Sequence, residues 1–441
     1  MRPPDQLATR IAEQVREGTL PPGDPTAIAL DRIYTHDPRV RAFVHVDDTG
    51  ARRSADALSE HSSDGRLLGV PVGVKDVIDT ADMPTQHGSP IFAGHRPAGD
   101  AAAVGRLRAA GAVVIGKTVT NELGASHPGP TRNPHDQERT PGGSSSGSAA
   151  AVAAGFVPVA LGTQTGGSIV RPASFCGVLG MKPTRGLLDQ RGVGGHCPTI
   201  DTLGLLARST GDLSLTLEVL AGDRWPGERE PTITSLGIMA PPEADLAAST
   251  RRGWTALLEK LRTSPGLTVA DAAPAVGQEL LDAPLTIIRT ETAEHLGHLL
   301  DRHTEQLSHR LTAAIEHGRR IPRSEYEAAL ASVRAAEQDL PRLFGGHHAL
   351  LGLTVTHEAP RGIDTSGDPA PHRLWSALGV PVVSLPLLRG PTDLPIGVLL
   401  IGRPEGDVEL LRLAHRLLPY AVAPAGSPPV TARSAEPRDR R

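Results

Sequence analysis

The sequence predicts an α/β fold, on three observations. From about Leu67 onward, short apolar runs alternate with alanine-rich stretches, a pattern typical of strands layered with helices. Glycine- and serine-rich loops follow these runs, at positions where strand ends are available for chemistry. The chain has 441 residues, and single hydrophobic cores stop growing near ~250–300 residues. We therefore expect either one large enzyme-type domain with added layers or two domains.

The expected elements fall into three parts. An N-terminal helical segment covers residues 1–65, with helices over 6–17 and 25–36. The α/β core covers 66–421, and its expected elements in chain order are strand 67–74, helix 100–110, strand 112–115, helix 148–154, strand 157–161, strands 349–355, 380–387 and 396–401, and helix 407–418. Within the core, about 212–345 is mainly helical, with long amphipathic stretches at 290–317 and 324–343, and we interpret it as an insertion. The Pro-, Ser- and Arg-rich tail 422–441 is expected to be disordered.

Composition excludes several functional classes. The formal charge is −4, from 45 Lys and Arg against 49 Asp and Glu, which gives no electrostatic basis for direct nucleic-acid or membrane binding. The two cysteines, Cys176 and Cys197, exclude a disulfide scaffold, and the histidines lack metal-site spacing, so we expect no metal. The N-terminus has no signal-peptide core, and the longest apolar stretch is shorter than the ~20 residues that span a bilayer. We expect a cytoplasmic enzyme.

Residues 111–118, Gly-Ala-Val-Val-Ile-Gly-Lys-Thr, match the letters of a nucleotide-binding phosphate loop. Such a loop needs flexible residues between its glycines, so that successive N–H groups can curl around phosphate. The residues Ala-Val-Val-Ile favour an extended strand instead. We interpret the segment as a strand, with Lys117 an ordinary residue just past its end.

Three segments carry residue types suited to nucleophilic catalysis. They are 69–76 (Gly-Val-Pro-Val-Gly-Val-Lys-Asp), 141–148 (Pro-Gly-Gly-Ser-Ser-Ser-Gly-Ser) and 162–172 (Gly-Thr-Gln-Thr-Gly-Gly-Ser-Ile-Val-Arg-Pro). Only four of the 45 Lys and Arg residues are lysine, and a desolvated lysine can lose its proton near neutral pH, which arginine cannot do. Lys75, at the end of an apolar strand, is therefore a candidate general base. Alternatively, Lys75 pairs with Asp76, Asp79 or another acidic residue.

The two loops add hydroxyl groups that a base can activate. Gly166-Gly167-Ser168 offers consecutive backbone N–H groups with no side chains in the way, which suits an oxyanion hole. Taken singly, each loop is also typical of a surface turn. Together with Lys75, the loops of Ser144 and Ser168 are compatible with a Ser-Ser-Lys relay, provided that the three side chains meet in space.

These segments resemble the defining signature of the amidase signature family. The likeness covers 141–155 and 162–184, and further likeness is found from about residue 28 and at 116–118, 133–134, 375–381, 385–386 and 394–398. It spans nearly the whole chain except 220–345 and both ends. The resemblance implies a large mixed sheet covered on both faces by helices, with a helical insertion. It also implies an amide hydrolase that works through an acyl-enzyme without a cofactor.

The resemblance implies a role for each matching residue. Lys75 would be the base, Ser144 the bridging serine after a cis peptide at Gly143, and Ser168 the nucleophile. Ser145 would support their hydrogen-bond network. The substrate carbonyl oxygen would be received by four backbone N–H groups, those of Thr165, Gly166, Gly167 and Ser168.

Two positions depart from the pattern of many family members. This chain has Gln164 where they carry Asp, and Arg171 stands three residues after Ser168 instead of two. The combination is similar to a malonamidase-like subgroup, in which the arginine grips a substrate carboxylate. Gln164 and Arg171 are thus candidate substrate-binding residues. The alternative is that Arg171 pairs with a structural acid such as Asp201.

Three functions remain open on these grounds. The first is hydrolysis of a small carboxamide, which makes a small-molecule amide the expected partner and leaves a homodimer open. The second is the glutaminase-type subunit of a tRNA-dependent amidotransferase, although the Gln164 and Arg171 pattern counts against it. The third is acyl transfer to an amine in biosynthesis, for which the same residues would serve.

Overall fold

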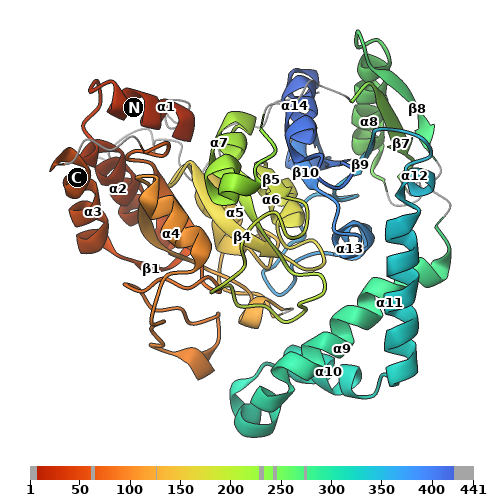
Figure 1. The fold of residues 1–441 in the computed structure, drawn as a ribbon, viewed down its shortest axis with the longest axis horizontal. Helices are drawn as coiled ribbons and strands as arrows, with labels where there is room; N and C mark the ends of the chain where they lie inside the picture. The colour runs from red at the N-terminus through yellow and green to blue at the C-terminus, as the bar shows by residue number, and fades with distance from the viewer. Residues whose placement is uncertain are drawn as a thin grey trace, which may run out of the picture.

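The computed structural model describes residues 7–60, 65–125, 127–227, 233–241, 246–272 and 276–421; the predicted tail at 422–441 lies outside these ranges. One mixed sheet of eleven strands forms the centre, in the order β1-β3-β2-β4-β6-β5-β10-β11-β9-β7-β8 (Figure 1). The strands are β1 (Phe43–Val46), β2 (Pro71–Lys75), β3 (Val113–Thr118), β4 (Val159–Gln164), β5 (Leu179–Lys182), β6 (Thr202–Ala207), β7 (Ser235–Met239), β8 (Thr268–Ala272), β9 (Ala349–Leu353), β10 (Val382–Arg389) and β11 (Pro395–Ile401). The predicted large mixed sheet is confirmed.

Helices cover both faces of this sheet, as expected. The helices are α1 (Ala8–Arg16), α2 (Gly23–Val40), α3 (Asp48–Glu60), α4 (Ala102–Ala109), α5 (Ser146–Ala153), α6 (Val170–Cys176), α7 (Thr210–Ala221), α8 (Ala248–Arg262), α9 (Gln278–His303), α10 (His309–Arg319), α11 (Arg323–Gln338), α12 (Leu340–Leu343), α13 (Ala370–Ala377) and α14 (Asp407–Leu417). One hydrophobic cluster joins α1, α4, α7, α8 and α14 to the sheet, and a second joins α2, α3, α5 and α6 to it. None of the described helices combines the length and hydropathy needed to span a bilayer.

Strand pairing brings the three signature segments to one edge of the sheet. Strand β2 is buried along its whole length and runs parallel to β3 on one side and to β4 on the other. The carboxyl ends of parallel strands meet at the same edge, so Lys75 and Gln164 end their strands side by side. The Gly/Ser loop leads into α5, which packs on β2 and β4 from one face. Sequence segments far apart in the chain thereby converge.

The segment 212–345 contains more than the expected helices. Strands β7 and β8 lie within it and form the far edge of the sheet beyond β9. The expected long helix over 290–317 is two helices, α9 and α10, separated by residues 304–308. Helices α9, α10 and α11 pack on one another and project away from the sheet at the lower right of Figure 1. Helix α9 also packs on α13, next to the carboxyl-end loops.

The segment 111–118 is a strand, as predicted, but the expectation for Lys117 was wrong. Strand β3 runs to Thr118, so Lys117 lies inside it and is fully buried. Its Nζ donates to the carbonyl oxygen of Ile78 and to the hydroxyls of Thr80 and Thr85. The strand that the apolar residues begin continues through Lys117 to Thr118.

Candidate active site

Within the part of the chain that the structure describes, Lys75 contacts hydroxyl groups and no carboxylate. It ends β2 and is fully buried. Its Nζ lies 2.8 Å from Ser144 Oγ and 2.7 Å from Thr163 Oγ1. The alternative pairing with Asp76 does not occur, because that carboxylate lies 3.9 Å from Lys117 Nζ instead. A buried amine with only hydroxyl partners is set up to exchange protons with them.

Burial controls the charge of this amine. Desolvation lowers the pKa of Lys75 to about 7, and the negative charge of Asp201 opposes the shift. An ammonium ion without a carboxylate in contact has lost its hydration shell without full compensation. A substantial fraction of Lys75 is therefore neutral at pH 7, as a general base requires.

The Ser144 loop is anchored to the loop of Ser168. The Gly143–Ser144 peptide bond is cis, as the family resemblance implied. Ser145 lies next to it, and its backbone N–H donates to the carbonyl oxygen of Ser168 at 3.2 Å. The Ser145 hydroxyl accepts from the N–H of Thr163 at 3.2 Å. Ser145 thus ties the two loops and the end of β4 together, in line with the supporting role expected for it.

Gln164 organises the turn that follows β4. Its Oε1 accepts from the N–H groups of Ile169 (2.9 Å) and Val170 (3.1 Å), and its Nε2 donates to Ser376 Oγ at 3.0 Å. These bonds satisfy N–H groups at the start of α6, which have no partner within the helix. Gln164 is buried and does not line the cavity described below. Its contacts fit a positioning role better than the expected substrate contact.

The turn at 165–168 presents four unused backbone donors. Among the described residues, no hydrogen bond uses the N–H of Thr165, Gly166, Gly167 or Ser168. Gly167 has φ +151°, and a Cβ there would lie 2.7 Å from His372 Nδ1, so only glycine fits. The turn therefore has the free donors that an oxyanion hole requires.

Ser168 opens into a cavity of about 330 Å³. Thr165, Gly166 and Arg171 line the same cavity, and α9 and α10 close its other side. Among the contacts within the described ranges there is no hydrogen bond between the Ser168 and Ser144 hydroxyls. Thr165 and Ser168 are the hydroxyl-bearing residues of the signature that line this cavity, and the Thr165 hydroxyl already donates to Asp201, which leaves Ser168 as the candidate nucleophile.

Arg171 is buried beneath this cavity. Its Nη2 donates to the carbonyl oxygen of Gly143 at 2.6 Å, while Nε and Nη1 have no hydrogen-bond partner. Burial lowers the pKa of Arg171 to about 10, so it stays charged at neutral pH. The alternative pairing with Asp201 is absent from the described contacts: that carboxylate accepts from the Thr165 hydroxyl and from backbone N–H groups of 196–197.

Sequence reasoning missed Thr163, Asp201 and His196 as parts of the site. Thr163 contacts Lys75, and Asp201 holds the Thr165 hydroxyl. The imidazole of His196 lies 3.4 Å from Thr165 Oγ1 and 2.9 Å from Thr292 Oγ1 of α9. Thr163 lies within the signature and could have been suspected, because its side chain is one of the few polar groups on β4. Asp201 and His196 lie outside the signature segments, and only the tertiary structure brings them next to Thr165.

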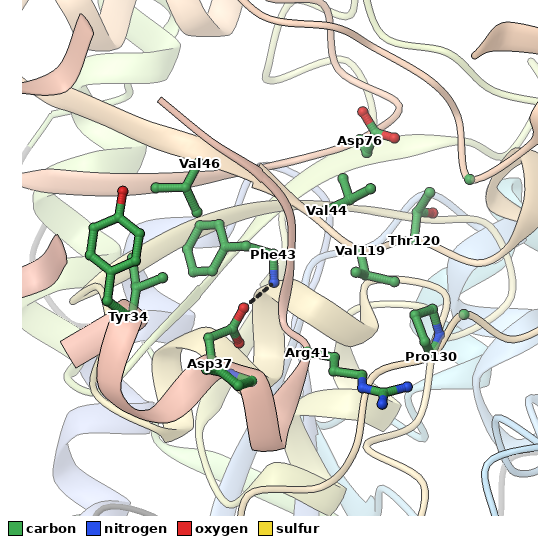
Figure 2. A pocket seen from close by; sticks show the side chains of 14 residues that line it. Tyr34, Asp37, Arg41, Phe43, Val44, Val46, Asp76, Val119, Thr120 and Pro130 are labelled. Carbon is green, nitrogen blue, oxygen red and sulfur yellow. Dashed lines mark hydrogen bonds between the residues drawn. The ribbon is translucent and has the colours of Figure 1, made fainter. Parts of the chain in front are cut away.

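A larger cavity, of about 710 Å³, lies elsewhere and lacks these groups. It adjoins edge strand β1 and α2, and Figure 2 shows Phe43, Val44 and Val46 with Tyr34 around it. Asp37 in its wall accepts from the N–H of Phe43 at 3.1 Å. Its lining contains neither a serine nor a lysine, so size does not identify the catalytic cavity here. Within the described ranges, no group of three or more His, Cys, Asp or Glu is placed to hold a metal ion.

This chain is similar in sequence to proteins of known name. It is 44% identical over 232 residues to a glutamyl-tRNA(Gln) amidotransferase subunit of Roseiflexus castenholzii, a match that covers 50% of this chain and 47% of that protein. This match thus spans about half the length of that relative. The protein of the same name from Anaeromyxobacter dehalogenans is 34% identical, over 91% of this chain and 93% of its own length.

Solved structures give the same picture. A crystal structure of an amidase superposes with a TM-score of 0.85 at 30% identity and covers 93% of this chain and 99% of that one. A peptide amidase bound to the competitive inhibitor chymostatin has a TM-score of 0.82 at 27% identity, over 96% and 98%. The sequence profile of the family described as Amidase matches residues 24–411. This chain belongs to the amidase family, the amidase-signature hydrolases that act on amides.

Proposed function

We propose that this enzyme hydrolyses a small carboxamide through a Ser168–Ser144–Lys75 relay and an acyl-enzyme. The observation that carries the proposal is the 2.8 Å contact between Lys75 Nζ and Ser144 Oγ in a buried site. Ser145 connects this pair to the loop of Ser168. Catalytic hydrogen bonds are often loose without substrate, so we expect the two serine hydroxyls to meet when the cavity is filled.

The relay moves one proton in each direction. Neutral Lys75 accepts the proton of Ser144, which takes the proton of Ser168 as Ser168 Oγ attacks the amide carbon. The four free N–H groups of 165–168 receive the negative oxygen of the tetrahedral intermediate. The C–N bond then breaks, and the proton returns through Ser144 to the departing nitrogen. Water attacks the ester by the same relay and releases the carboxylate.

The position of Arg171 indicates that the enzyme prefers anionic substrates. Two of its three guanidinium nitrogens are buried without a partner, on the cavity that Ser168 faces. A planar guanidinium suits a carboxylate, which can accept two parallel hydrogen bonds from it. We propose that Arg171 binds a carboxylate of the substrate. Hydrolysis of neutral and anionic amides by Arg171→Ala checks this: the variant should lose the anionic substrate selectively, and equal losses would contradict it.

The direct test is ammonia release from a panel of simple amides by the purified chain. Ser168→Ala should lose about 10⁴-fold or more in kcat, because the nucleophile of a relay acts with its partners as a unit. Ser214→Ala, on α7 and away from the cavity, is the matched control and should retain full activity. Ammonia release that persists in Ser168→Ala would refute the assignment of the nucleophile.

A second candidate is the glutaminase-type subunit of a tRNA-dependent amidotransferase, favoured by the names of the relatives above. In that case the chain would release ammonia from glutamine efficiently only with partner subunits. The purified chain, shown to be free of other proteins by size exclusion, separates the two functions. Rapid turnover of a small amide by the isolated chain supports the first, and turnover that appears only with the other amidotransferase subunits present supports the second.

A further inference from the structure

The wall of the cavity at Ser168 carries more positive charges than one substrate carboxylate would neutralise. Besides Arg171, three arginines line it: Arg289 of α9, Arg310 of α10 and Arg373 of α13. None of the residues that line it is an aspartate or glutamate. A cleft lined by charges of one sign attracts ligands of the opposite sign. The cavity is therefore built for negative charge.

Arg289 and Arg373 lie near each other and near the Gly166–Ser168 turn. A Cβ on Gly166 would lie 3.6 Å from Arg373 Cγ and 4.0 Å from Ile288 Cδ1, the residue before Arg289. Burial lowers the pKa of Arg373, the charge of Asp368 opposes this shift, and the charge of Arg289 adds a smaller lowering. Two guanidinium groups that repel each other at a half-buried site favour an anion between them.

The protein itself supplies little compensation for these charges. Within the described ranges, the guanidinium groups of Arg289 and Arg373 form no hydrogen bond and no ion pair within 4.0 Å. Asp368 interacts favourably with Arg373 and Arg171 at longer range, but its Oδ1 accepts from the N–H of Ala370 at 2.9 Å. Arg310 differs, because it is exposed and donates to the carbonyl oxygen of Asp364.

We propose that the substrate is an amide with two anionic groups, one bound by Arg171 and the second held between Arg289 and Arg373. The proposal rests on the proposed function for the position of the amide at Ser168. Arg171 is buried and belongs to α6, whereas Arg289 and Arg373 are half-buried and come from α9 and α13. A single carboxylate bound at Arg171 would leave the positive charges of Arg289 and Arg373 without an anionic partner. A second carboxylate would satisfy it with bidentate contacts.

Binding to Ser168→Ala, measured by calorimetry, tests this without turnover. The probes are butyramide, succinamate with one carboxylate, and a monoamide of propane-1,2,3-tricarboxylic acid with two. We expect the dianion to bind at least about tenfold more tightly than succinamate, since one hydrogen bond to a charged group is enough for that factor. Adding Arg289→Gln and Arg373→Gln should remove this difference and leave succinamate within about twofold. Arg302→Gln, at an exposed position on α9, is the control for the loss of a positive charge outside the cavity.

Two results would overturn the proposal: equal binding of succinamate and the dianion, or equal weakening of both by the double substitution. Ammonia release by the enzyme with Ser168 intact keeps the two proposals apart. Tight, arginine-dependent binding of the dianion without any ammonia release contradicts the proposed function and supports the second anion site. Ammonia release that does not depend on the number of carboxylates supports the function and refutes the site.

Discussion

Lys75 and Lys117 are both buried lysines of the central sheet, but their side chains contact different groups. They lie on the neighbouring parallel strands β2 and β3, one register position apart, and both are fully buried. Lys117 faces Asp76 at 3.9 Å, a carbonyl group and two threonines. Among the described residues, the hydrogen-bond partners of Lys75 Nζ are the hydroxyls of Ser144 and Thr163. Burial lowers the pKa of Lys117 to about 8 and that of Lys75 to about 7. An offset of one register position places the two side chains on opposite faces of the sheet, so Lys75 meets the hydroxyls that suit its proposed role as proton acceptor, while Lys117 meets a carboxylate and a carbonyl group.

The largest effect should come from Lys75→Arg. Arginine keeps a positive charge and cannot accept a proton, so kcat for amide hydrolysis should fall by about 10³-fold or more. Lys260→Arg, at an exposed position on α8, is the matched control and should leave kcat unchanged. A thermal melt of both variants separates loss of chemistry from loss of folding. Substantial activity in Lys75→Arg would mean that protons do not pass through this position.

The reverse pattern is expected for Lys117→Met. Removal of this ammonium leaves Asp76 buried without its cation, which should lower the free energy of unfolding by about 3 kcal/mol. The kcat per folded molecule should stay within a few-fold of the unsubstituted enzyme. Urea unfolding together with active-site-normalised kinetics measures both quantities. If kcat collapsed while stability held, Lys117 would belong to the chemistry and the contrast with Lys75 would be wrong.

The pH dependence of kcat/KM should report Lys75. A lysine with a pKa lowered to about 7 is neutral above that pH and charged below it. Activity should therefore rise with pH to a plateau, and the value at pH 6 should be about tenfold below the value at pH 8. Initial rates with a substrate that does not titrate in this range, such as a neutral amide, give the profile. A profile that is flat from pH 6 to 8 is incompatible with a base of this pKa.

Thr163→Val should have the smallest effect. Valine keeps the shape of threonine but removes the oxygen that lies 2.7 Å from Lys75 Nζ. The lost hydrogen bond leaves the amine less well oriented toward Ser144, so kcat should fall by about fivefold. Thr85→Val, which removes the hydroxyl that lies 2.7 Å from Lys117 Nζ, should leave kcat unchanged. Equal effects of the two substitutions would remove the distinction between the two lysine environments.

The candidate residues at strand ends could be recognised because their pattern is local in the sequence. Lys75 is a polar residue at the end of an apolar run, and Ser144 and Ser168 lie in Gly/Ser loops. The sheet strands β2, β3 and β4 follow from apolar, β-branched residues. Strand β8 could not be recognised, because it is largely exposed and forms no apolar run. Strand β7 contains a short apolar run at 236–239, but this run lies between stretches expected to be helical, so the sequence does not distinguish it from them.

The parts of the site that come from distant segments could not be predicted from the sequence. Asp201 and His196 reach Thr165 through the chain that leads into β6, and Arg289 and Arg373 come from α9 and α13. Nothing in their local sequence distinguishes these residues from other polar residues on helices or loops. Only tertiary packing places them around Ser168. The second anion site that we propose therefore depends on residues outside the sequence motifs, whereas Arg171 lies within one of them.

The proposed mechanism depends on a neutral Lys75, and direct titration of its amine is the decisive measurement. With only four lysines in the chain, ¹⁵N-labelled lysine side chains give few signals, and the signal lost in Lys75→Arg identifies the residue. We expect the Lys75 Nζ resonance to titrate with a midpoint near pH 7. An amine that stays protonated above pH 9 would contradict its role as the base.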